Sequence, residues 1–142
     1  MQEQDTKLIA HLLRRAGFGA TQDELAANAA QGYDATVKEL LEPTDPRWMG
    51  DFMARRFHHE QSGMMGPWGS GDNWLYRMIT TSAPLHEKIT LLWHGIFATG
   101  YPKVIHGKML SNQIRMFRRY GLGNFKTLLS ELAKDPAMIV WL

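Results

Sequence analysis

The amino-acid sequence predicts an all-α fold, an irregular or orthogonal bundle of about six to eight helices. Along most of the chain, apolar residues recur at the 3.6-residue spacing of amphipathic helices. Residues that typically begin or end helices interrupt this pattern at short intervals. No segment shows the sustained alternation of apolar and polar residues that is typical of a half-buried strand.

The first part of the chain predicts three successive helices. The first of them ends near Gly17. Thr21 and Glu24 have the spacing of a capping box, which opens a second, alanine-rich helix that ends at Gly32. A third helix begins at Asp34 and ends before the next proline. The apolar face of the first helix consists of Leu8, Ile9, Leu12 and Leu13.

The middle of the chain predicts two further helices around a glycine-rich loop. Residues 48–60 have helical periodicity, whereas residues 62–73 are rich in glycine and are expected to form a loop. Asp72 or Asn73 can cap the helix that follows. Pro84 fits the first turn of the next helix, the most hydrophobic of the chain, which we expect at the centre of the bundle.

The last part of the chain predicts a long helix over residues 105–120, closed by Gly121, and a shorter helix capped by Asn124. Asp135 and Pro136 mark the start of a new segment after this helix. The residues that follow them are apolar to the end of the sequence. Apolar side chains at the end of a chain are usually buried against other residues. We therefore expect that this apolar end docks into this domain or that the natural protein continues.

Composition limits the classes of function. The 142 residues suit one helical domain, 1–142. The absence of cysteine excludes disulfides, thiolate zinc sites, iron–sulfur clusters and a cysteine nucleophile. No apolar run approaches the ~20 residues that a membrane-spanning helix needs. Because no histidine pair has a recognisable metal-ligand spacing and no nucleotide-binding glycine pattern occurs, we predict no metal and no cofactor.

Positive charge is concentrated in residues 88–130, which contain seven Lys or Arg and no Asp or Glu. Residues 1–87, by contrast, have 8 basic and 12 acidic side chains. Such a run predicts either a site for an anion or a partner, or neutralisation by carboxylates elsewhere in the protein. The candidate anion- or partner-binding residues are Lys88, Arg115, Arg118, Arg119 and Lys126.

His94 is the one candidate catalytic residue. It lies in the most apolar predicted helix, where a buried imidazole tends to lose its proton and needs a hydrogen-bond partner. Gly95 beside it would let a ligand or another backbone approach closely. The alternative interpretation of His94 is a hydrogen-bonded histidine of the core.

Three blocks of the sequence resemble the bacterial family called domain of unknown function 1800. They are HLLRRAGFGAT at residues 11–21, PLHEKITLLWHGIFATG at residues 84–100 and RRYGLGNFKTLLSELAKDPAMIVWL at residues 118–142. The resemblance implies a helical fold and supplies no reaction. Because family members are several hundred residues long and continue with a block resembling PNENYAREL, it also implies the N-terminal portion of a larger protein. Association of the family with exported proteins implies a location outside the cytoplasm, in the envelope or beyond it.

Together these features predict a helical module whose basic surface, residues 88–130, docks an acidic partner protein or the missing C-terminal part of its own protein. Two alternatives remain open at this point. The same residues could form half of an enzyme cleft that acts on an anionic substrate, or they could bind nucleic acid through arginines and interleaved aromatic rings.

Overall fold

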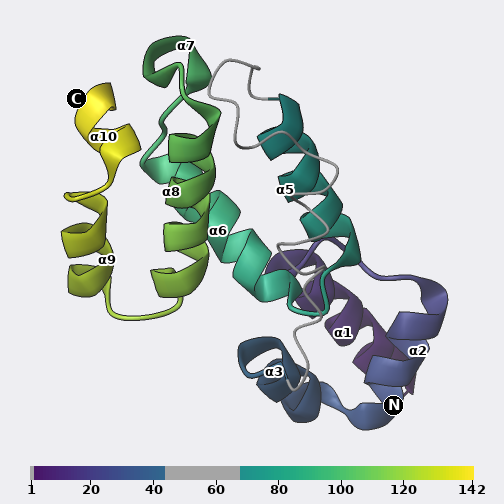
Figure 1. The fold of residues 1–142 in the computed structure, drawn as a ribbon. Helices are drawn as coiled ribbons and strands as arrows, with labels where there is room; N and C mark the ends of the chain where they lie inside the picture. Colours follow the sequence, from purple (N-terminus) through teal and green to yellow (C-terminus); the bar gives the residue numbers. More distant parts are fainter. Residues whose placement is uncertain (1, 44–67) are drawn as a thin grey trace.

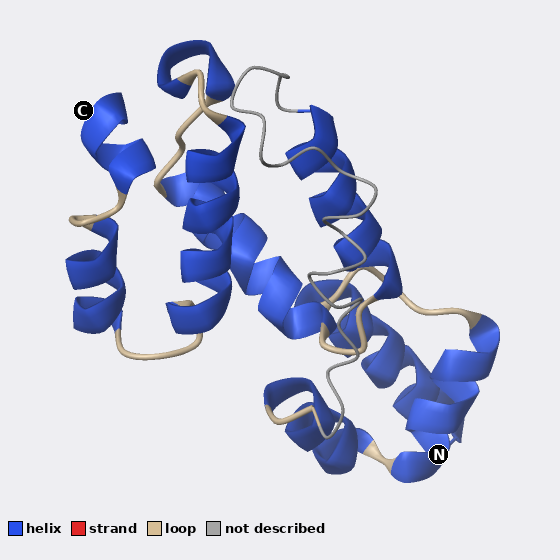
Figure 2. Ribbon diagram, viewed as in Figure 1, coloured by secondary structure: helices blue, strands red, loops and turns tan. Residues whose placement is uncertain are grey.

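The computed structural model describes residues 2–43 and 68–142, and all regular structure in these two ranges is helical (Figures 1 and 2). The all-α prediction is therefore confirmed. The described residues form nine helices, two of which are very short. They are α1 (Gln2–Ala16), α2 (Gln22–Gln31), α3 (Tyr33–Leu41), α5 (Trp68–Thr80), α6 (Pro84–Ile96), α7 (Tyr101–Val104), α8 (Gly107–Tyr120), α9 (Phe125–Leu132) and α10 (Pro136–Trp141).

Helix α6 joins two groups of helices (Figure 1). Helices α1 to α3 pack together at one end, and α7 to α10 pack together at the other. Helix α6 contacts α1 and α3 on one side and α8 on the other, while α5 packs against both α6 and α8. Each group has its own apolar cluster. The buried members are Ile9, Leu13 and Leu40 in the first, and Phe117, Leu128, Leu132 and Met138 in the second.

Several predicted helix ends are confirmed, but the prediction that Asp72 or Asn73 caps a helix is wrong, because both residues lie inside α5. Thr21 and Glu24 form the capping box of α2 by exchanging side-chain and backbone hydrogen bonds. Gly32 follows α2 with φ +96°, a conformation that suits glycine. Asn124 caps α9, and the Asp135 side chain accepts a hydrogen bond from a backbone N–H of α10.

The prediction of a loop over residues 62–73 is wrong for the part that the structure describes. Helix α5 begins at Trp68 and therefore includes residues that the glycine pattern assigned to the loop. Each glycine weakens a helix by roughly 1 kcal/mol relative to alanine, a penalty that tertiary packing can outweigh. Here α5 packs against α6 and α8. The predicted helix over residues 48–60 and the remainder of the loop lie outside the described residues.

Helix α6 occupies the central position expected for it, but the distribution of its side chains is the reverse of a simple core helix. Its fully buried residues are polar, Glu87 and Thr90. Three of its large apolar residues are exposed, namely Leu91, Leu92 and Ile96. Within residues 2–43 and 68–142, no helix is long and apolar enough to cross a membrane.

Gly121 allows α6 and α8 to approach closely. A Cβ atom at this position would lie 2.9 Å from Cδ1 of Trp93 and 3.0 Å from Cγ2 of Ile89. The backbone conformation of Gly121 is an ordinary right-handed helical one, so space rather than φ requires the glycine. The Trp93 indole N–H then donates to the Gly121 carbonyl oxygen at 2.9 Å, which fixes the end of α8 on α6.

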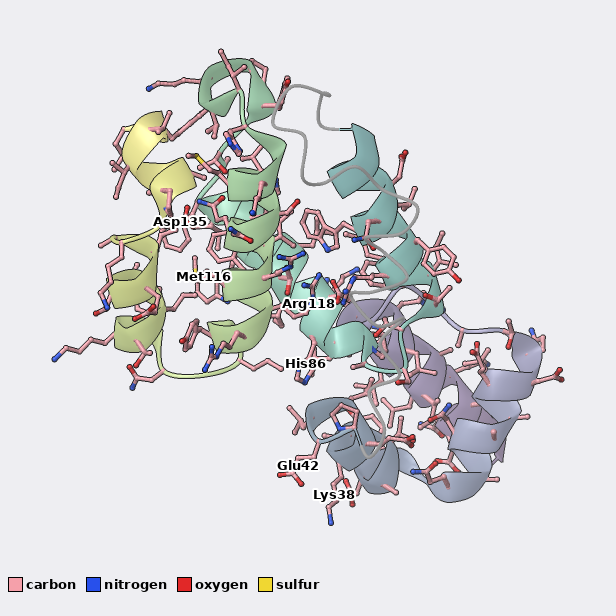
Figure 3. All side chains as sticks on the ribbon, viewed as in Figure 1. Lys38, Glu42, His86, Met116, Arg118 and Asp135 are labelled. Atoms are coloured by element: carbon pink, nitrogen blue, oxygen red, sulfur yellow. The ribbon has the colours of Figure 1, made fainter. Side chains whose placement is uncertain are left out.

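A buried polar chain ties α8 to the segments on either side of it. The Thr99 hydroxyl donates to Oε1 of Gln113, and Nε2 of Gln113 donates to Oδ1 of Asp135 at 2.8 Å. The same carboxylate oxygen accepts from the backbone N–H of Met138, at the turn between α9 and α10 that faces α8 (Figure 3). Because each of the three side chains is buried, each requires its partners.

Replacing Gln113 with alanine should lower the free energy of unfolding by about 3 kcal/mol. The substitution leaves a cavity and removes the hydrogen-bond partner that Thr99 and Asp135 share. Urea denaturation measures this change. Gln31→Ala is the control, since this glutamine is exposed and donates to Glu39 at the surface; its effect should stay within about 0.5 kcal/mol. Equal effects of the two substitutions would show that the buried chain does not stabilise the fold.

Candidate anion pocket and exposed apolar face

A fully buried carboxylate, Glu87, lies at the junction of α5, α6 and α8. Arg118 of α8 points toward α5 and α6 (Figure 3). Its guanidinium donates two parallel hydrogen bonds to the Glu87 carboxylate. Nε of Arg118 is 2.6 Å from Oε1, and Nη2 is 3.0 Å from Oε2. The Trp74 indole N–H of α5 donates to Oε2 at 3.0 Å. A carboxylate without water needs such partners, and the bidentate arginine supplies both charge and geometry.

A small, half-open pocket lies beside this ion pair, between α5 and α8. The empty space there, counted together with the open solvent at its mouth, is about 300 Å³. Three guanidinium groups contribute to its wall, two from α8 and one from α5. The described lining residues are Asn73, Trp74, Arg77, Ser111, Ile114, Arg115 and Arg118. The described part of the pocket wall is therefore rich in arginine.

The structure brings together two of the five predicted anion- or partner-binding residues, Arg115 and Arg118, in the wall of this pocket. The other three lie elsewhere. Arg119 is exposed, with its guanidinium 5.2 Å from the centre of the Tyr120 ring. Nζ of Lys88 lies 5.1 Å from the centre of the Phe18 ring. Lys126 is exposed in the first turn of α9.

Sequence reasoning missed the residues that complete the pocket from other positions. Arg77 lies on α5, outside the acid-free run that directed attention to residues 88–130. Glu87 immediately precedes that run, so the run itself gives no sign that one of its arginines has a buried counter-ion. The pattern of α6 gives no such sign either, because Glu87 lies on the face opposite the large apolar residues, which amphipathicity assigns to solvent.

His94 lies on α6 against the ring of Trp74, edge to face, with ring centres 5.3 Å apart. Partial burial lowers the pKa of His94 below its ordinary value of 6.5, because desolvation disfavours the charged imidazolium. Its Nδ1 is buried and forms no hydrogen bond with the described residues. It is not among the residues that line the pocket. Within the described ranges, no group of three or more potential metal ligands occurs.

A second feature is an exposed apolar surface on α6 and α9, here called the α6–α9 face and defined by Leu92, Ile96, Phe125 and Leu129. Leu92 and Ile96 are neighbours on α6 by their spacing, as are Phe125 and Leu129 on α9. The Trp93 ring connects the two pairs, because Ile96 is three residues from Trp93 and Phe125 stacks on its ring at 5.6 Å.

Lysines border both ends of the α6–α9 face. Lys88 precedes Leu92 by four residues on α6, and Lys126 precedes Leu129 by three residues on α9. These spacings make each lysine a surface neighbour of the apolar residue that follows it. The face is therefore apolar in its middle and positively charged at its edges.

Replacing Glu87 with glutamine should lower the free energy of unfolding by about 3 kcal/mol, because it leaves the Arg118 charge without its buried partner. Chemical denaturation gives the value. The matched control is Glu131→Gln, which breaks the solvent-exposed pair with Lys134 and should cost less than about 0.5 kcal/mol. A loss for Glu87→Gln as small as that for the control would contradict the importance of the buried pair.

The depressed pKa of His94 predicts loss of stability in mild acid. As pH falls below about 6.5, the unfolded chain binds a proton at His94 before the folded protein does, so the free energy of unfolding decreases until the lower folded pKa is passed. Denaturation of the protein at pH 7.5 and at lower pH values should show this decrease. His94→Gln should reduce it, whereas substitution of the exposed His11 should not. An unchanged decrease in His94→Gln would overturn the assignment.

Comparison with known proteins gives one match. The model of the family described as "Protein of unknown function (DUF1800)" matches residues 11–142. No curated protein and no solved structure matches the chain. The match includes every described helix from α2 to α10 and the C-terminal part of α1. It also includes both the pocket and the α6–α9 face. Because the family model matches most of the sequence, the chain belongs to the DUF1800 family.

Proposed function

We propose that this domain is a docking module, whose α6–α9 face binds an amphipathic, acidic segment of another polypeptide or of another part of its own protein. The observation that carries the proposal is the exposure of neighbouring large apolar side chains. Leu92 is 50% exposed, Ile96 57% and Phe125 53%. A connected patch of this kind typically marks an interaction surface, whereas isolated exposed apolar residues need no explanation.

The inverted pattern of α6 supports the proposal. Glu87 and Thr90 occupy the inward face of this helix, and Leu92 and Ile96 occupy the outward face. A helix whose most apolar face points away from its own domain gains free energy when that face is covered. Completing the burial of four half-exposed side chains is worth on the order of 1 kcal/mol each, or about 4 kcal/mol in total, which by itself corresponds to a dissociation constant of about 1 mM.

Gly95 supplies an independent argument. It lies on the exposed side of α6, and no described atom is within 4 Å of the position that its Cβ would occupy. No described residue therefore requires a glycine there, although a glycine in a helix costs up to about 1 kcal/mol relative to alanine. Close approach by a partner backbone would provide the missing reason, as at helix contacts where small residues allow backbones to approach.

Charge selects the kind of partner. Lys88 and Lys126 border the face, and the chain has no acidic side chain from residue 88 to residue 130. A partner with carboxylates beside its apolar stripe would complement these lysines, whereas a second copy of this chain would bring like charges together. Nucleic acid would complement the lysines but would leave the aliphatic side chains of the face without a role.

A pair of synthetic amphipathic helices tests the proposal. Both carry a leucine stripe, flanked by glutamates in one peptide and by lysines in the other, and fluorescence anisotropy measures their binding to the intact chain. The acidic peptide should bind, more weakly as salt increases, and the basic peptide should not. Joint substitution of Leu92 and Ile96 by serine should weaken binding at least about tenfold, because most of the apolar contact is removed.

A matched pair on another helix controls this experiment. Leu75 and Ile79 of α5 have the same residue types, the same spacing and comparable exposure, and they lie outside the α6–α9 face. Their joint substitution by serine should leave binding unchanged. Gly95→Ala should stabilise the free domain slightly yet weaken binding. Equal losses from both serine pairs, or equal binding of both peptides, would refute the docking surface.

A further inference from the structure

We infer that the docking surface continues from the α6–α9 face onto α1, where it binds a further acidic stretch of the same partner. The inference rests on the proposed docking function and extends it to the first group of helices. The added surface, here called the α1 extension, is defined by Arg14, Arg15 and Phe18. Arg14 and Arg15 lie in the last turn of α1, and Phe18 lies in the loop that follows this helix.

Lys88 connects the α1 extension to the α6–α9 face. Its Nζ lies 5.1 Å from the centre of the Phe18 ring, a favourable contact between a cation and an aromatic face. The same lysine is one helical turn from Leu92 on α6, so it borders both surfaces. Helix α1 packs against α6 (Figure 1). A partner that lies along the exposed side of α6 therefore meets Phe18 beyond Lys88.

Two glycines define the loop that presents Phe18. A Cβ atom on Gly17 would lie 3.1 Å from Cβ of Pro84, so the glycine lets the loop lie directly on the first residue of α6. Gly19 has φ +108°, a conformation that other residues rarely adopt. Phe18 between them is 43% exposed. A large ring on a loop of defined conformation offers a partner apolar contact at little cost in conformational entropy.

Charge favours the same kind of partner at both surfaces. Residues 6–22 include Arg14 and Arg15 but no Asp or Glu, and they form a second acid-free segment beside residues 88–130. Both arginines are exposed, and neither forms an ion pair with another described residue. Because the two acid-free segments meet at Phe18 and Lys88, the carboxylates of one partner can complement both segments.

The geometry of α6 sets a lower limit on the length of the partner. Ile96 follows Lys88 by eight residues, or about 12 Å along the helix, and Phe18 lies beyond Lys88. A partner helix therefore needs roughly three turns to contact both surfaces. Single-stranded nucleic acid also binds aromatic rings and cations, but it stacks its bases on successive rings, whereas Leu92 and Ile96 continue this surface with aliphatic side chains.

Three acidic peptides test the inference on the intact chain by fluorescence anisotropy. The first is the glutamate-flanked leucine helix that tests the α6–α9 face. The other two add a glutamate-rich segment containing leucine, either at the N-terminus or at the C-terminus of that helix. Because only one end of the α6–α9 face leads to Phe18, one extended peptide should bind about tenfold tighter than the first, and the other should gain little. Moderate salt should reduce this gain.

Two variants locate the gain in affinity. Phe18→Ser should remove most of it, because the apolar contact of the α1 extension is lost. Arg14→Gln combined with Arg15→Gln should reduce it at least about threefold, because the carboxylates of the added segment lose their counter-charges. If Phe18→Ser loses its helical circular dichroism, the arginine variant decides, since both of its positions are exposed.

Each variant has a matched control at exposed positions outside the α1 extension. Tyr33→Ser removes a ring of comparable exposure from α3. Lys38→Gln combined with Lys108→Gln removes two positive charges from α3 and α8. Both controls should retain the full gain. Equal losses in the variants and their controls, or equal gains by the two extended peptides, would overturn the α1 extension, since they would show only general attraction between charges.

The peptides also separate failure of the α1 extension from failure of the docking function. If the first peptide binds and neither extended peptide binds tighter, the α6–α9 face stands and the α1 extension is wrong. If no peptide binds, the docking function itself fails and the α1 extension fails with it. Binding of single-stranded oligothymidylate that is tighter than that of every peptide, and that is lost in Phe18→Ser, would assign these residues to nucleic acid and would also overturn the inference.

Discussion

A carboxylate without access to solvent constrains the centre of this domain. Glu87 can remain ionised inside the protein only if cationic and neutral donors surround it, and Arg118 and Trp74 provide them from two other helices. The resulting contact joins α5, α6 and α8 at one point. An apolar core at this position could provide comparable stability, but it would not orient a guanidinium beside the pocket. The ion pair thus determines geometry as well as stability.

The ion pair also separates two surfaces with different chemistry. On one side of α6, Glu87 and Thr90 point inward, and Glu87 pairs with Arg118 of α8. On the other side, Leu92 and Ile96 point outward and continue through Trp93 to Phe125 of α9. A helix with a polar interior face and an apolar exterior face is understandable if each face serves a different contact. Both surfaces lie within the residues that the DUF1800 family model matches.

The sequence predicted the helical class and several helix ends because these depend on local signals. The capping box at Thr21 and the cap at Asn124 are short-range features that a sequence displays directly. The start of α5 was missed because tertiary packing outweighed the glycine penalty there. The pocket could be predicted only in part. Charge density pointed to Arg115 and Arg118, but Arg77 in the same wall and Glu87, the partner of Arg118, come from outside the basic run, through contacts that no spacing rule encodes.

A double-mutant cycle on Glu87 and Arg118 tests most directly whether their ion pair organises the domain. Unfolding free energies are measured for the parent, for Glu87→Gln, for Arg118→Gln and for the double variant. If the two side chains stabilise each other as described, the double variant should be more stable than the sum of the single losses implies, with a coupling of about 2 kcal/mol or more. Additivity within about 0.5 kcal/mol would show that the contact is incidental, and the organisation of α5, α6 and α8 around it would have to be abandoned.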